Sequence, residues 1–175
     1  MKDSILQIGG LANTYSMRSS AVPSSSPLGV DIVRALKRLQ RDVESVLAKS
    51  NVNKLCVSIS KGRSNLPRIL YVAVSRTIDR LSSEPCVGIC FDERGSGVVI
   101  GMMYPQVYLK TTKHEKKVRS KGEMLVDLSS SRSKSNFNDL FVNPYELTLE
   151  DLDCELLTNH LLESIRLLEA EIYEH

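Results

Sequence analysis

The sequence contains no tryptophan, and only 5% of its 175 residues are aromatic. Proteins that bind carbohydrate or stack single-stranded bases use exposed flat rings, so this composition argues against both classes. No apolar run approaches the roughly 18 residues that a membrane-spanning helix needs. The N-terminus is too weakly apolar for a signal peptide. We therefore expect a cytoplasmic protein that does not act in a membrane.

An excess of charge of one sign is also missing, because 23 Lys+Arg residues face 21 Asp+Glu residues. Only the placement of charge can therefore favour a polyanionic partner. The four cysteines, Cys56, Cys86, Cys90 and Cys154, stand in apolar surroundings, and the three histidines are scattered along the chain. This pattern predicts buried free thiols in a reducing compartment and no metal site. Cys86 and Cys90 are expected on the same face of a strand.

Motifs for nucleotide or acyl chemistry are missing as well. The chain has no GxxxxGK[ST] loop and no GxSxG sequence. Gly95-Ser96-Gly97 lacks the third glycine and the following helix of a dinucleotide site, and it is typical of a hairpin turn. We expect no cofactor and no catalytic residue.

One long helix is predicted over residues 30–50, where apolar side chains recur at spacings of three and four. Its other faces carry four cations, Arg34, Lys37, Arg38 and Arg41. These cations form either an ordinary solvated face or a surface that meets phosphate groups.

The middle of the chain changes to short segments rich in valine and isoleucine, bounded by turn residues, which predict strands. These segments cover residues 54–60, 68–75, 86–93 and 97–104, with residues 105–110 as an extension of the sheet.

The C-terminal segment is acidic and predicts an amphipathic helix over residues 152–172. Thr148 and Asp151 have the spacing of a capping box before this helix. The fold class is therefore α+β, with a small, mostly antiparallel or barrel-like sheet flanked by an N-terminal and a C-terminal amphipathic helix. Residues 1–29 are expected to be a flexible arm and Ser/Pro-rich tether, and residues 30–175 a single domain.

Cations gather in two segments that are expected to be loops beside the sheet. Lysine and arginine displace condensed counterions from DNA phosphates, so such loops favour a duplex-binding surface. The predicted DNA contacts are Lys61, Arg63, Asn65 and Arg68 in one loop, and Lys113, Lys116, Lys117, Arg119 and Lys121 in the other.

Two alternatives stay open. The first is a protein-interaction module that docks through its amphipathic helices. The second is a Mg²⁺-dependent nuclease using Asp92, Glu115 and Lys117, although Glu115 stands in a charged run where a strand would be needed to hold it beside Asp92.

The order of these segments resembles the N-terminal DNA-binding domain of McrB-type modification-dependent restriction proteins. The likeness rests on KGRSNLPRI (residues 61–69), on the Gly88-containing strand with the strand after it, and on the leucine-rich segment that begins at Leu147. It covers about residues 30–172.

This resemblance implies a non-catalytic target-recognition module for double-stranded, sometimes modified, DNA. In that family the module is normally fused to an AAA+ GTPase motor, which assembles with a separate nuclease subunit. Some members extrude a methylated cytosine into an aromatic pocket, and others read a groove with loops. This sequence has no tryptophan and has Arg68 where the family usually has an aromatic residue, so groove reading or phosphate-driven binding is expected here.

Overall fold

The computed structural model describes residues 1–16, 21–52, 54–60, 64–67, 69–77, 84–91, 97–105, 108, 125–127 and 139–173. The helices in this part of the chain are α1 (Lys2–Ser16), α2 (Pro27–Lys49) and α5 (Cys154–Tyr173). The strands are β1 (Cys56–Ile59), β2 (Tyr71–Ser75), β3 (Cys86–Phe91), β4 (Gly97–Pro105), β5 (Leu125–Asp127) and β6 (Asp139–Thr148).

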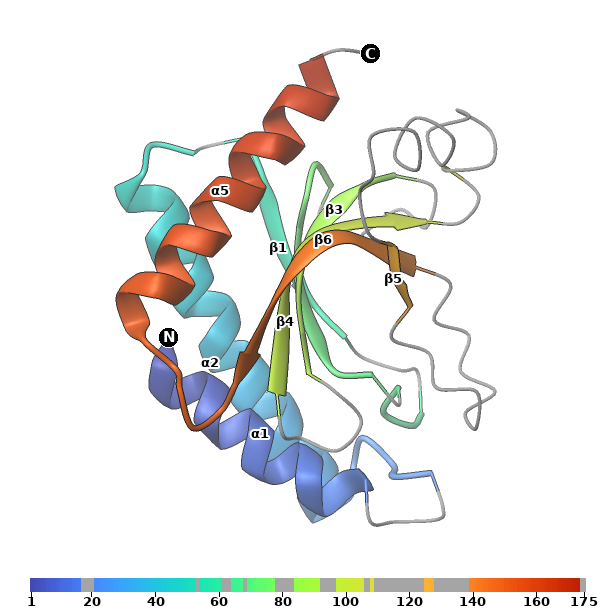
Figure 1. Cartoon of the computed structure of the whole chain (residues 1–175). Helices are drawn as coiled ribbons and strands as arrows, with labels where there is room; N and C mark the ends of the chain where they lie inside the picture. Colours follow the sequence, from blue (N-terminus) through green and yellow to red (C-terminus); the bar gives the residue numbers. More distant parts are fainter. Residues whose placement is uncertain are drawn as a thin grey trace.

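The strands form one antiparallel sheet in the order β1-β2-β3-β4-β6-β5. The three helices lie together on one side of this sheet (Figure 1). The α+β prediction is confirmed, as is the antiparallel sheet with helices at both ends of the fold. The sheet is open, with β1 and β5 at its edges within the described residues, so the barrel-like alternative is wrong.

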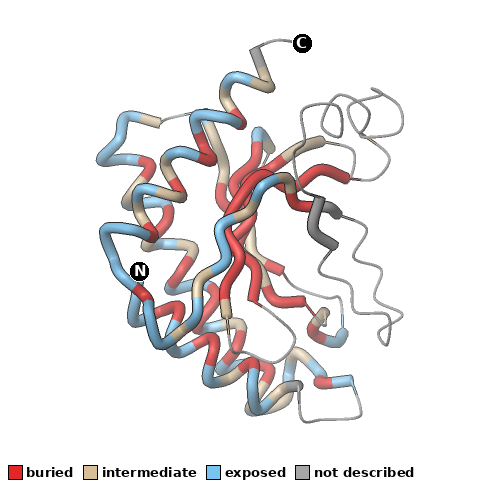
Figure 2. The backbone as a smooth tube through the Cα atoms, in the orientation of Figure 1, coloured by how far each residue is buried: buried red, intermediate tan, exposed pale blue. Residues whose placement is uncertain are grey.

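Both faces of the central strands are buried, which explains why they read as continuous apolar runs (Figure 2). Val87, Ile89 and Phe91 of β3 belong to the core under the helices. Cys86 and Cys90 alternate with them and pack on the other face, in a smaller apolar cluster. The prediction that these two cysteines share one strand face is confirmed.

The prediction of four buried thiols is wrong for the other two cysteines. Cys56 is half-buried, because β1 is an edge strand, and Cys154 is exposed in the first turn of α5. None of the four cysteines forms a disulfide bond.

Helix α2 begins three residues before the predicted position. Ser26 is its N-cap, since its hydroxyl oxygen accepts a hydrogen bond from the Gly29 backbone N–H at 3.1 Å, and Pro27 supplies a preset φ for the first turn. The buried stripe of α2 packs on β1 and β2 and consists of Ile32, Ala35, Leu36, Leu39, Val43 and Leu47. Its opposite side is therefore fixed toward solvent.

The expectation of a flexible arm is wrong for residues 2–16, which form α1. Ile5 and Ile8 are fully buried in the core under the sheet, and Ala12 continues their stripe. Full burial of each isoleucine contributes about 1.5–3 kcal/mol, which offsets the cost of about 1 kcal/mol for each helical glycine in Gly9-Gly10. Gly9 is also the point of close packing, because a Cβ there would overlap Leu149 before α5.

Strand β6 was not predicted, and its geometry explains why. Proline within a run normally argues against a strand, but the register between β4 and β6 shifts opposite Gly101 and accommodates Pro144 in a bulge. Asn143 takes the left-handed conformation at φ 43°, which asparagine tolerates better than most residues. The bulge therefore lets a strand of ten residues continue through an Asn-Pro sequence.

Candidate nucleic-acid interface

One of the nine predicted DNA contacts, Asn65, belongs to the described part of the chain, where it is exposed. It forms an isolated antiparallel bridge with Pro23, the segment that leads into α2. The other eight lie outside the described residues: Lys61, Arg63, Arg68, Lys113, Lys116, Lys117, Arg119 and Lys121.

The described part of the β1–β2 connection is held from two sides. The Ser24 N–H donates to the Ser64 carbonyl and the Leu66 N–H donates to the Val22 carbonyl, both at 2.9 Å. From α1, the Tyr15 hydroxyl lies 3.1 Å from the Leu66 carbonyl oxygen and 3.2 Å from that of Pro67. Asn65 therefore lies next to the start of α2, a placement that the sequence does not predict because it depends on backbone pairing with Pro23, more than forty positions earlier.

The two connections that carry the predicted contacts start at different places along the sheet. Ser60, which directly follows β1, is hydrogen-bonded to Tyr71 of β2. Tyr71 pairs with Cys90 of β3, and Cys90 pairs with Val99 near the start of β4, so Ser60 and Val99 lie in the same row across the sheet. The β4–β5 connection begins after Pro105, at the opposite end of β4. Six residues of strand separate these rows by about 20 Å.

The outer side of α2 carries the four cations that the sequence placed there. Arg34, Lys37, Arg38 and Arg41 are all exposed, and no carboxylate occurs between residues 32 and 41. Arg34 forms an ion pair of 3.1 Å with Asp31, and Arg38 donates a hydrogen bond of 3.3 Å to the amide oxygen of Gln7 on α1. A cationic surface thus exists within the described residues, apart from the predicted loops.

The opposite charge is concentrated in the last part of the chain. Residues 146–173 contain eight carboxylates and one cation, Arg166. Helix α5 packs on β4 and β3, whereas α2 packs on β1 and β2. The helical layer is therefore basic on the outer side of α2, next to β1 and β2, and acidic along α5, next to β3 and β4.

Helix α5 begins later than the predicted capping box implies. Thr148 does donate a hydrogen bond of 2.8 Å to Asp151, but the helix begins at Cys154. Asp153 is the N-cap, since its carboxylate accepts the backbone N–H groups of Glu155 and Leu156 at 2.7 and 2.9 Å. These hydrogen bonds, that of Leu156 first, lower the pKa of Asp153.

Two tyrosines, one in β6 and one in the connection after β4, form hydrogen bonds to the acidic helix. Tyr145 of β6 stacks on His160 with ring centroids 3.4 Å apart and donates to Glu163 at 2.8 Å, which raises the pKa of Tyr145. Tyr108 donates to Glu171 at 2.7 Å, and burial together with this carboxylate raises the pKa of Tyr108. Both tyrosines therefore stay protonated and act as hydrogen-bond donors.

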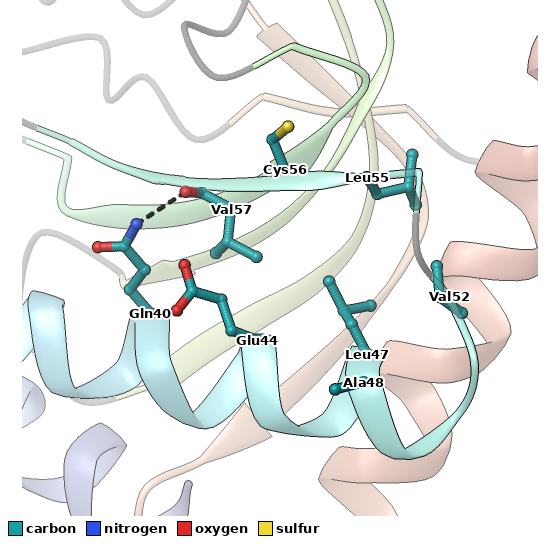
Figure 3. A pocket seen from close by; sticks show the side chains of 8 residues that line it. All are labelled: Gln40, Glu44, Leu47, Ala48, Val52, Leu55, Cys56 and Val57. Carbon is teal, nitrogen blue, oxygen red and sulfur yellow. Dashed lines mark hydrogen bonds between the residues drawn. The ribbon is translucent and has the colours of Figure 1, made fainter.

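A groove of about 460 Å³ lies between α2 and the edge strand β1 (Figure 3). Its lining is mainly aliphatic, with Glu44 as the charged group and with Gln40 at one end. The Gln40 amide donates to the Val57 carbonyl at 2.8 Å and so occupies a hydrogen-bonding position on the open edge of β1. The groove contains no nucleophile paired with a base, so it does not have the arrangement of a catalytic site.

Comparison with known proteins adds no relative to these observations. No family model, curated protein or solved structure matches the chain. The resemblance to McrB-type domains therefore stays a prediction, and a functional assignment depends on the charges and geometry described above.

The described residues also contain no group of three or more His, Cys, Asp or Glu side chains placed to hold a metal ion. In the same residues no helix is long and apolar enough to cross a membrane. Asp92, Glu115 and Lys117, the residues of the nuclease alternative, lie outside the described part of the chain.

Proposed function

We propose that this chain binds duplex DNA and acts as a non-catalytic specificity domain of a prokaryotic restriction or phage-defence system. A motor and a nuclease on other domains or subunits would supply catalysis. The DNA-binding part of the proposal is supported by charge segregation, and the restriction context by the resemblance in residues 61–69 and in the segments that follow.

The observation that carries the proposal is the separation of charge along the chain and across the fold. Residues 1–145 hold 22 cations and 12 carboxylates, whereas residues 146–175 hold one cation and nine carboxylates. The described part of this acidic segment lies in β6, α5 and the turn between them. A polyanion is thus attracted to the remainder of the molecule and repelled by this segment, although the net charge is only +2.

Counterion release gives this arrangement its energetic effect. Each phosphate that a lysine or arginine neutralises makes log K fall by about 0.9 for each tenfold rise in salt. A domain with six phosphate contacts would show a slope of about −5. Such binding needs no enzyme chemistry and no cofactor.

The test is a titration of labelled duplex with the full chain at several NaCl concentrations between about 50 and 200 mM. We expect a steep fall in affinity with salt, and Lys116→Ala with Lys117→Ala should flatten the slope by about two units if both contact phosphate. No detectable binding at the lowest salt, or an affinity that does not change with salt, would refute the proposal.

A second candidate, docking of another protein, is favoured by one observation on α5. Leu156 and Leu167 on its outer side are 41% and 57% exposed, which is unusual for large apolar residues on a helix that is otherwise acidic. If this face binds a second copy of the chain, sedimentation without nucleic acid should show concentration-dependent association. Leu167→Ser should abolish that association, and a chain that stays monomeric at all concentrations excludes self-docking.

A further inference from the structure

We infer that the outer side of α2 is a phosphate-contacting surface for duplex DNA, a role that rests on the proposed function. We call this surface the α2 cationic face, and it consists of Arg34, Lys37, Arg38 and Arg41. It is distinct from the two loops in which the sequence predicts DNA contacts.

The spacing of the four cations puts them on one side of the helix. Positions i, i+3, i+4 and i+7 are neighbours on a helix surface, and the buried stripe that includes Leu36 and Leu39 points this side outward. Seven residues of helix rise by about 10 Å. The same length of duplex axis presents about three phosphates of each strand, so the face matches a short stretch of DNA backbone.

Three of the four cations have no competing ion pair among the described residues. Lys37, Arg38 and Arg41 form no salt bridge there, although Arg38 donates a hydrogen bond to Gln7. Arg34 is paired with Asp31, but both side chains are more than half exposed. An exposed ion pair of this kind contributes little to stability, so a phosphate can replace Asp31 as the partner of Arg34. The face can therefore accept phosphates without breaking a stable internal interaction.

Carboxylates border the α2 cationic face but do not lie within it. On the side of α1, exposed Gln7 and Gly10 are uncharged and Gly10 has open space around it, whereas exposed Asp3 lies one turn before Gln7. Asp42 is already compensated, since Ser4 donates to its carboxylate at 2.6 Å and the N-terminal ammonium lies at 3.1 Å. Glu44 is exposed one turn after Arg41, where it marks the end of the face, and it also lines the groove beside β1 (Figure 3).

The experiment compares three full-length proteins in the same salt titration of labelled duplex DNA. The test variant is Lys37→Ala with Arg41→Ala, and the control is Lys2→Ala with Arg166→Ala, which removes the same charge from exposed sites on α1 and α5. Alanine maintains a helix, so circular dichroism spectra should be unchanged.

We expect the slope of the test variant to be flatter by about two units and its affinity in 0.1 M salt to be about 60-fold lower, while the control resembles the wild type. Lys37→Glu with Arg41→Glu should bind more weakly still. If the wild type binds DNA but the test variant matches the control, contact by this face is overturned and the proposed function stands. If the wild type itself does not bind, the proposed function fails.

Discussion

Replacement of Ile8 by alanine tests whether α1 is an integral part of the fold. Ile8 is fully buried against the core, so Ile8→Ala removes three carbon atoms from a site without solvent. The lost transfer free energy is about 2.4 kcal/mol at 0.8 kcal/mol per methylene, and the remaining cavity adds to it. We expect a total loss of about 3 kcal/mol, which lowers the melting temperature of a domain of this size by about 6–12 °C.

The assay is urea denaturation followed by circular dichroism, with Leu6→Ala as the matched control. Leu6 lies on the same helix but is 39% exposed, so its truncation should cost no more than about 1 kcal/mol. A similar slope of free energy against urea in all proteins would show that the native surface is unchanged. Equal destabilisation by the two variants would refute the packing of α1 against the sheet.

Three further predictions address local features. A thiol reagent should modify Cys154 in the native protein but not the two buried cysteines of β3, and rapid labelling of the latter would contradict the packing of the sheet. Gly29→Ala should destabilise the protein, because the added Cβ would overlap the Pro23 carbonyl oxygen. Gly10→Ala should instead stabilise it by up to about 1 kcal/mol, because the added Cβ meets open space. Thermal melts in which Gly29→Ala is the more stable variant would be inconsistent with the structure. Asp153→Ala should lower the melting temperature at neutral pH. Because the folded-state pKa of Asp153 is lowered, this difference should persist above the ordinary carboxylate pKa of about 3.9 and vanish as pH falls through the lowered value; a pH-independent difference would contradict the cap.

The periodic segments of the sequence were sufficient to predict α2, α5 and the four strands from β1 to β4. Helix α1 was missed because its signal is short and interrupted. Ile5, Ile8 and Ala12 have helical spacing, but Gly9-Gly10 lowers the intrinsic helix propensity. The free energy that favours this helix comes from tertiary contacts, which are the burial of Ile5 and Ile8 and the close approach of Gly9 to Leu149. These contacts cannot be inferred from the local sequence.

Strand β6 was missed for a related reason. In sequence, Asn143-Pro144 indicates a turn. It is compatible with a strand here because Gly101 lies opposite and leaves room for a bulge. The partner lies more than forty positions away along the chain. A periodic apolar pattern identifies elements that are stabilised by burial of one regular face. It cannot identify an element that depends on one small residue far away in the sequence.

For the candidate interface, the sequence shows where charges cluster along the chain but not how the fold distributes the described ones. The described part of the β1–β2 connection is hydrogen-bonded, on both sides of Asn65, to the segment that precedes α2, beside the basic half of the helical layer. The β4–β5 connection starts in the other half, where Tyr108 is hydrogen-bonded to Glu171 of the acidic helix. A duplex that contacts α2 and the β1–β2 connection together avoids the repulsion of α5, whereas a duplex centred on the start of the β4–β5 connection approaches it. If the chain binds duplex DNA as proposed, electrostatics favours the α2 side as the primary contact surface. This expectation follows from the paired segments of the fold rather than from the density of lysine in the sequence.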